Sequence, residues 1–61
     1  MDDEIESLIL RAYGEAVLAA REKGLSGMAA QNAAYKAAAK VASRVAGVTV
    51  TVEQVAEVVR G

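Results

Sequence analysis

The sequence contains no cysteine, histidine, proline, phenylalanine or tryptophan. Without cysteine, the chain can form neither a disulfide bond nor a thiolate metal site. The absence of histidine and cysteine also removes the side chains that most often act as general bases, nucleophiles and metal ligands. The remaining acidic residues are spread along the chain. We therefore expect no catalytic site, no metal site and no bound cofactor.

Large apolar side chains are scarce as well. Hydrophobic residues make up 54% of the chain, but aromatic residues make up only 3%. A chain of 61 residues buries only about 60% of the surface of its unfolded form. A core built mainly from alanine and valine then leaves a monomer with marginal stability. We therefore expect a homo-oligomer, in the simplest case a homodimer.

Neither sign of charge dominates, because 7 basic residues stand against 8 acidic ones and the net charge is −1. This balance gives no overall field that would attract nucleic acid or an anionic membrane. Residues 2–4 are acidic, unlike the basic start of a secretory signal, and Lys36, Lys40 and Arg44 interrupt the alanine-rich stretch, which excludes a membrane span. The composition is consistent with a small bacterial or phage protein, which we expect to be cytoplasmic.

Two alanine series predict how the chain folds. Alanine recurs every four residues in 12–20 and again in 30–46, and residues four apart share one face of an α-helix. Folding the chain back at residues 24–26 sets the two series against each other as an antiparallel helical hairpin. The facing pairs are then Ala20 and Ala30, Ala16 and Ala34, Ala12 and Ala38, Ile9 and Val41, and Ile5 and Val45.

Local signals mark where the two hairpin helices begin and end. The first helix is predicted over about residues 2–23, with Gly24 in the left-handed conformation that ends it. Ser26 is the predicted N-cap of a second helix over about residues 27–46.

A third, shorter helix is predicted over about residues 52–60. Thr51 and Gln54 have the spacing of a capping box, and valines recur on one stripe. The Val-Thr alternation of residues 48–51 favours a strand but is too short to form a sheet by itself. The whole chain, residues 1–61, is therefore predicted to be one all-α domain, a small three-helix bundle.

A second apolar strip lies beside the alanines on the two long helices. The third helix spans only about 13 Å, so we expect it to cover the region of Ile5, Leu10 and Ala42 and to end short of the turn. The residues then left exposed mark an interaction surface. They are Tyr13, Val17, Met28 and Tyr35. In the alternative arrangement the third helix tilts along the groove and buries all four.

Gly14 lies inside the first predicted helix, where glycine costs about 1 kcal/mol relative to alanine. One explanation is that the ring of Tyr35 rests over the missing side chain. The other is that Gly14 is a tolerated surface residue.

The pattern favours a small structural or protein-interaction module without catalysis, acting through self-association or through a protein partner. The alternative is a small nucleic-acid-binding regulator, because the second helix carries a basic stripe and residues 47–55 share features of a helix-turn-helix. Its contacts would be Lys36, Lys40, Arg44, Gln54 and Arg60. Glu53 and Glu57 on the same short helix would repel phosphates, so this alternative ranks second.

Overall fold

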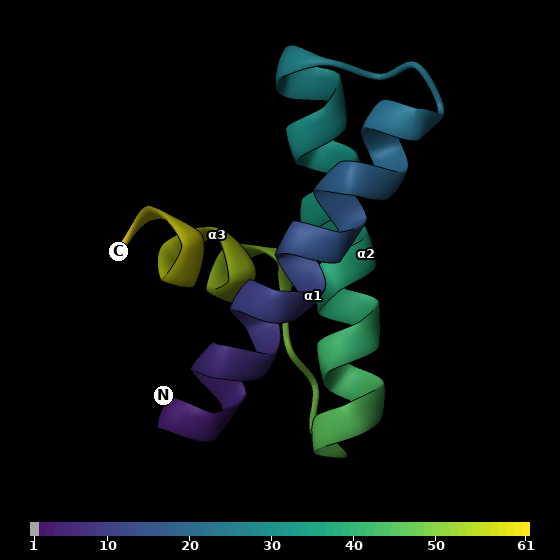
Figure 1. Cartoon of the computed structure of the whole chain (residues 1–61). Helices are drawn as coiled ribbons and strands as arrows, with labels where there is room; N and C mark the ends of the chain where they lie inside the picture. Colours follow the sequence, from purple (N-terminus) through teal and green to yellow (C-terminus); the bar gives the residue numbers. More distant parts are fainter. Residues whose placement is uncertain (1) are drawn as a thin grey trace.

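A computed structural model describes residues 2–61 and contains three helices joined by short connections (Figure 1). The helices are α1 (Asp3–Glu22), α2 (Gly27–Ala46) and α3 (Val52–Arg60). The two long helices form an antiparallel hairpin, and the short third helix packs against both. The predicted all-α three-helix bundle is confirmed, with every helix end within one residue of its expected position. Met1, which we included in the single domain, lies outside the described residues.

The turn between α1 and α2 uses glycine as the sequence predicts. Gly24 has a φ of +90°, and its N–H donates to the carbonyl of Arg21 at 2.9 Å. The N–H of Leu25 donates to the carbonyl of Ala20 at 3.0 Å. These two bonds form a Schellman motif, which ends α1. Ser26 lies at the N-cap of α2 as predicted, but its side chain makes no capping hydrogen bond.

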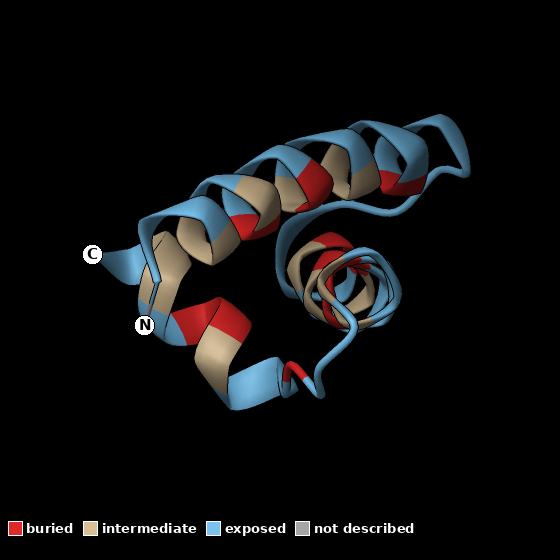
Figure 2. Cartoon of the chain, turned by 90° about the horizontal axis from the view of Figure 1, so that it is seen from below, coloured by how far each residue is buried: buried red, intermediate tan, exposed pale blue. Residues whose placement is uncertain are grey.

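Alanines fill the space between α1 and α2. Small side chains let two helix backbones approach closely, so the hairpin is held by many small contacts instead of a few large ones. Figure 2 shows the buried positions on the sides of the helices that face one another. The buried alanines of the hairpin are Ala12, Ala20, Ala30, Ala34, Ala38, Ala39 and Ala42.

The valines predicted to complete the interface at the open end of the hairpin are not buried. Ile9 is fully buried as expected, but Val41 is 40% exposed and Val45 is 66% exposed. Ala38 and Ala42, both fully buried, belong to the core cluster that contains Ile9. Val41 and Val45 each precede an alanine of the series by one residue, which is about 100° around the helix. They therefore point away from the face that the alanines bury.

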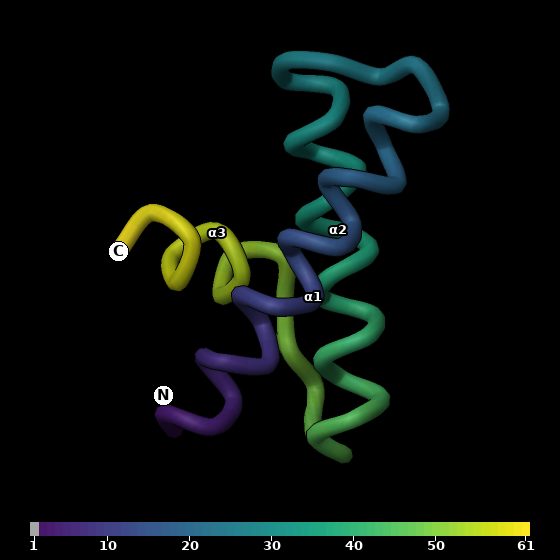
Figure 3. Tube along the Cα trace, viewed as in Figure 1, coloured from purple at the N-terminus to yellow at the C-terminus, as the bar shows by residue number. Residues whose placement is uncertain are grey.

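The connection between α2 and α3 runs back along α2 before α3 begins (Figure 3). The Oγ of Ser43 accepts a hydrogen bond from the N–H of Val50 at 2.8 Å and donates to the carbonyl of Val50 at 3.2 Å. Val50 itself is buried in the core. Ser43 therefore fixes the connection to α2 and sets where α3 starts.

The predicted capping box at the start of α3 is confirmed. The N–H of Gln54 donates to the Oγ1 of Thr51 at 3.1 Å, and the N–H of Thr51 donates to the Oε1 of Gln54 at 2.9 Å. From there α3 crosses the hairpin instead of running along it (Figures 1 and 2). Val55 is fully buried, and Val58 and Val59 pack against the core. Because of this crossing, α3 does not cover Leu10, which is 50% exposed, so that part of our expectation is wrong.

Candidate functional site

The four residues predicted to form an interaction surface lie on one side of the hairpin, and we call them the apolar flank: Tyr13, Val17, Met28 and Tyr35. Tyr13 and Tyr35 stack on each other across the two helices, with ring centroids 5.4 Å apart and planes 28° apart. Both rings are half-buried and pack against the core, and Val17 is also half-buried. Met28 is 71% exposed. Of the four residues expected to be exposed, Met28 is exposed, but the expectation is wrong for the other three, which are partly covered by the fold.

Gly14 has nothing resting over it. A Cβ added at this position would meet no atom within 4 Å, so the ring of Tyr35 does not cover it. Of the two explanations for Gly14, the surface glycine is confirmed, and the residue is exposed.

Beyond the tyrosine pair, toward the turn, the flank is hollowed. A cavity of about 410 Å³ lies between α1 and α2 there. Three residues of the apolar flank (Tyr13, Val17 and Met28) line it together with Arg21 and Gln31. The cavity is thus bordered by apolar side chains on one part of its wall and by the Arg21 guanidinium and the Gln31 amide on another.

Small side chains fill most of the core and several large apolar side chains are exposed, which is the reverse of the usual pattern in a small domain. Among residues 2–61, the largest side chains with full burial are those of Ile9 and Val55. In contrast, Leu18 is 63% exposed, and Leu10 and Met28 are also exposed. These exposed side chains are larger than the alanines that fill most of the core.

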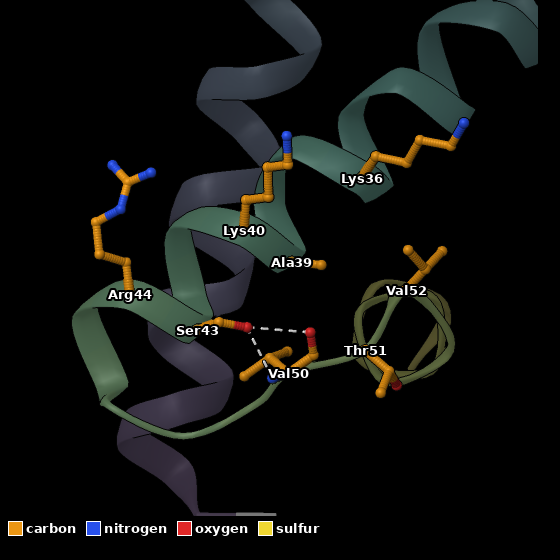
Figure 4. Close-up of a pocket in the computed structure, with 8 residues that line it drawn as sticks. All are labelled: Lys36, Ala39, Lys40, Ser43, Arg44, Val50, Thr51 and Val52. Carbon is orange, nitrogen blue, oxygen red and sulfur yellow. Dashed lines mark hydrogen bonds between the residues drawn. The ribbon is translucent and has the colours of Figure 1, made fainter.

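The basic stripe lines a second hollow, of about 720 Å³, between α2 and the start of α3. Figure 4 shows Lys36, Lys40 and Arg44 along its α2 side. Ala39, Val50 and Val52 form its apolar wall. α2 carries no acidic residue, so nothing on this helix neutralises the three cations. The arrangement favours an anionic group over a neutral one.

The other two predicted nucleic-acid contacts are engaged within the fold. The Oε1 of Gln54 accepts the capping bond from Thr51, and the Nε of Arg60 donates to the carbonyl of Ala56 at 3.3 Å. Glu53 and Glu57 are exposed on the same helix. α3 therefore presents two carboxylates to solvent, which would repel a phosphate backbone.

Residues 2–61 contain neither a group of side chains that could hold a metal ion nor a membrane-spanning helix. No group of three or more acidic residues in this part of the chain could hold a metal ion. No helix of the described chain combines the length and apolar character needed to cross a membrane. Comparison with family models, with curated proteins and with solved structures gives no match. Two surfaces therefore remain as candidate sites, the apolar flank and the hollow lined by Lys36, Lys40 and Arg44.

Proposed function

We propose that this protein is a small, non-catalytic interaction module that acts through its apolar flank, by forming a homodimer or by binding a protein partner. The observation that carries the proposal is that small side chains are buried while large apolar ones are exposed. Alanines occupy most of the core, while large apolar side chains face solvent: Met28 within the apolar flank, and Leu10 and Leu18 on α1 outside it. Burying Met28 and its neighbours in the flank against a second molecule would supply apolar contact that the monomer lacks.

The total surface area supports the same proposal. A compact monomer of 6.3 kDa is expected to expose about 3,700 Å². This chain exposes 4176 Å². The excess is about half of the roughly 800 Å² that each partner buries in a standard protein interface. The monomer is thus more open than its mass requires, by an amount that suits one small interface.

Sedimentation equilibrium tests the proposal with two matched variants of α2. Met28→Glu places a charge on the apolar flank, whereas Ala37→Glu places the same charge at an exposed position on another side of α2. We expect the wild type and Ala37→Glu to form dimers with similar affinity and Met28→Glu to dimerise at least tenfold more weakly. A wild type that sediments as a monomer up to millimolar concentration would refute self-association.

Nucleic-acid binding is the second candidate, and the hollow lined by Lys36, Lys40 and Arg44 is the observation that favours it. Phosphate contacts are strongest at low ionic strength, so a mobility-shift titration at low salt is the most sensitive test. Changing the three cations together to glutamine should abolish any shift without affecting dimerisation. The lack of a shift for the wild type at micromolar protein would remove this candidate.

A further inference from the structure

The hollow between α2 and the start of α3 combines an apolar wall with a row of cations. Lys36, Lys40 and Arg44 follow one another along its α2 side at four-residue spacing (Figure 4), and all three are exposed. In the apolar wall, Ala39 is buried and Val52 is 38% exposed. Among the described residues that line the hollow, none is acidic. The hollow therefore suits a ligand that is anionic on one side and apolar on the other.

We propose that this hollow binds an amphipathic helix of a protein partner, one that carries a row of carboxylates beside a row of aliphatic side chains. From Lys36 to Arg44 the row of cations extends about 12 Å along α2. Cations spread over this length match several anionic groups in a line better than one compact anion. Residues four apart in a partner helix recur about every 6 Å on one face, so their carboxylates can pair with successive cations.

The wall of the hollow favours a protein helix over a nucleic acid. Single-stranded nucleic acids bind largely by stacking their bases on aromatic side chains, but both tyrosines of the chain stack on each other at the apolar flank. A duplex would also extend over α3, where the exposed carboxylates of Glu53 and Glu57 repel phosphates. Aliphatic side chains of a helix, in contrast, bury apolar surface against Ala39 and Val52.

Hydrogen bonds within the fold hold the hollow in shape. Ser43 and Val50 both line it, and the two bonds between them, at 2.8 Å and 3.2 Å, fix the connection to α2. Thr51, which also lines the hollow, closes the capping box that starts α3. The wall and the row of cations are thus in place before a partner binds, which lowers the entropic cost of association.

Fluorescence anisotropy with a synthetic peptide tests the proposal. The probe is a labelled peptide of about 16 residues, long enough to form a helix, with glutamate and leucine in two adjacent rows at four-residue spacing. We expect the wild type to bind it in the micromolar range at low salt and Lys40→Glu to bind at least tenfold more weakly. Lys23→Glu makes the same change at an exposed position outside the hollow and should leave the affinity unchanged.

Val52→Thr tests the apolar wall separately, because it exchanges one methyl for a hydroxyl without changing the charge. It should weaken peptide binding about fourfold. An affinity unchanged in Val52→Thr, or reduced equally by Lys40→Glu and Lys23→Glu, would overturn the proposal, since the contact would then be one of charge alone or would lie elsewhere.

A DNA duplex is the competing probe. A wild type that binds the duplex as tightly as the peptide, or that does not bind the peptide at millimolar concentration, also overturns the proposal. Met28→Glu should bind the peptide as the wild type does, because Met28 lies on the apolar flank and not in this hollow. Failure of the peptide contact therefore leaves the proposed function standing, and a monomeric wild type leaves the peptide contact standing.

Discussion

Replacing Ser43 with alanine tests how α3 is held to the hairpin. The hydroxyl of Ser43 both accepts from the N–H and donates to the carbonyl of Val50, at 2.8 Å and 3.2 Å. Val50 is buried, with only 6% of its surface exposed. Its backbone polar groups therefore have limited access to water once the serine is gone.

The expected change in the free energy of unfolding is the sum of two opposing contributions. Leaving a buried backbone group without a partner costs about 1–3 kcal/mol. Alanine at position 43 stabilises the helix by up to about 0.5 kcal/mol, because its helix propensity is higher than that of serine. We expect Ser43→Ala to lower the free energy of unfolding by about 1–2 kcal/mol, which for a domain of this size lowers Tm by about 5–15 °C.

Urea denaturation followed by far-ultraviolet circular dichroism measures the effect at a fixed protein concentration. The control is Ser7→Ala, the same change at an exposed position of α1, which should change the free energy of unfolding by less than about 0.5 kcal/mol. If Ser43→Ala is as stable as the wild type, the serine does not fix the connection and the reasoning fails.

Three further experiments with substituted chains test other parts of the fold. At concentrations where the chain is monomeric, Gly14→Ala should raise the free energy of unfolding by about 0.5–1 kcal/mol. Gly47→Ala should lower the free energy of unfolding by about 1 kcal/mol, because the added methyl is equally unobstructed but φ is +74°. Equal shifts in Tm for the two variants would contradict this. Ala34→Leu should destabilise the hairpin by about 1–3 kcal/mol through overpacking, whereas Lys36→Leu should not, and equal urea midpoints would show that Ala34 is not at a tight contact. Thr51→Ala should cost about 1 kcal/mol by removing the cap of α3, and an unchanged Tm would refute that role.

The helices and most of their ends could be predicted because the signals that set them are local. The four-residue alanine spacing, Gly24 and the pair Thr51 and Gln54 each act within a few residues of where they stand in the sequence. The structure uses each of them as predicted. Ser26 is the partial exception, because its position is right while its side chain makes no cap.

The direction of α3 could not be predicted, because it depends on contacts between distant residues. The burial of Val50 and the bonds from Ser43 fix where the connection leaves α2. In the sequence Ser43 lies between Lys40 and Arg44. A serine among basic residues is usually solvated, so its position gave no sign of a contact with Val50. The Val-Thr alternation of residues 48–51 did not identify the residue that enters the core, because Val50 is buried whereas Val48 is 54% exposed. The candidate surfaces were only partly predictable for the same reason: the crossing of α3 leaves Leu10 exposed, and spacing alone could not reveal this.

The stacked pair of Tyr13 and Tyr35 is an intrinsic spectroscopic probe of the fold. These two tyrosines are its entire aromatic content, and the contact joins α1 to α2 without involving α3. Near-ultraviolet circular dichroism and tyrosine fluorescence therefore report on the contact between α1 and α2, while the far-ultraviolet signal follows all three helices. A titration in which helix content falls before the aromatic signal changes would identify α3 as a unit that opens by itself. Coincident curves would show that the short helix and the hairpin unfold together.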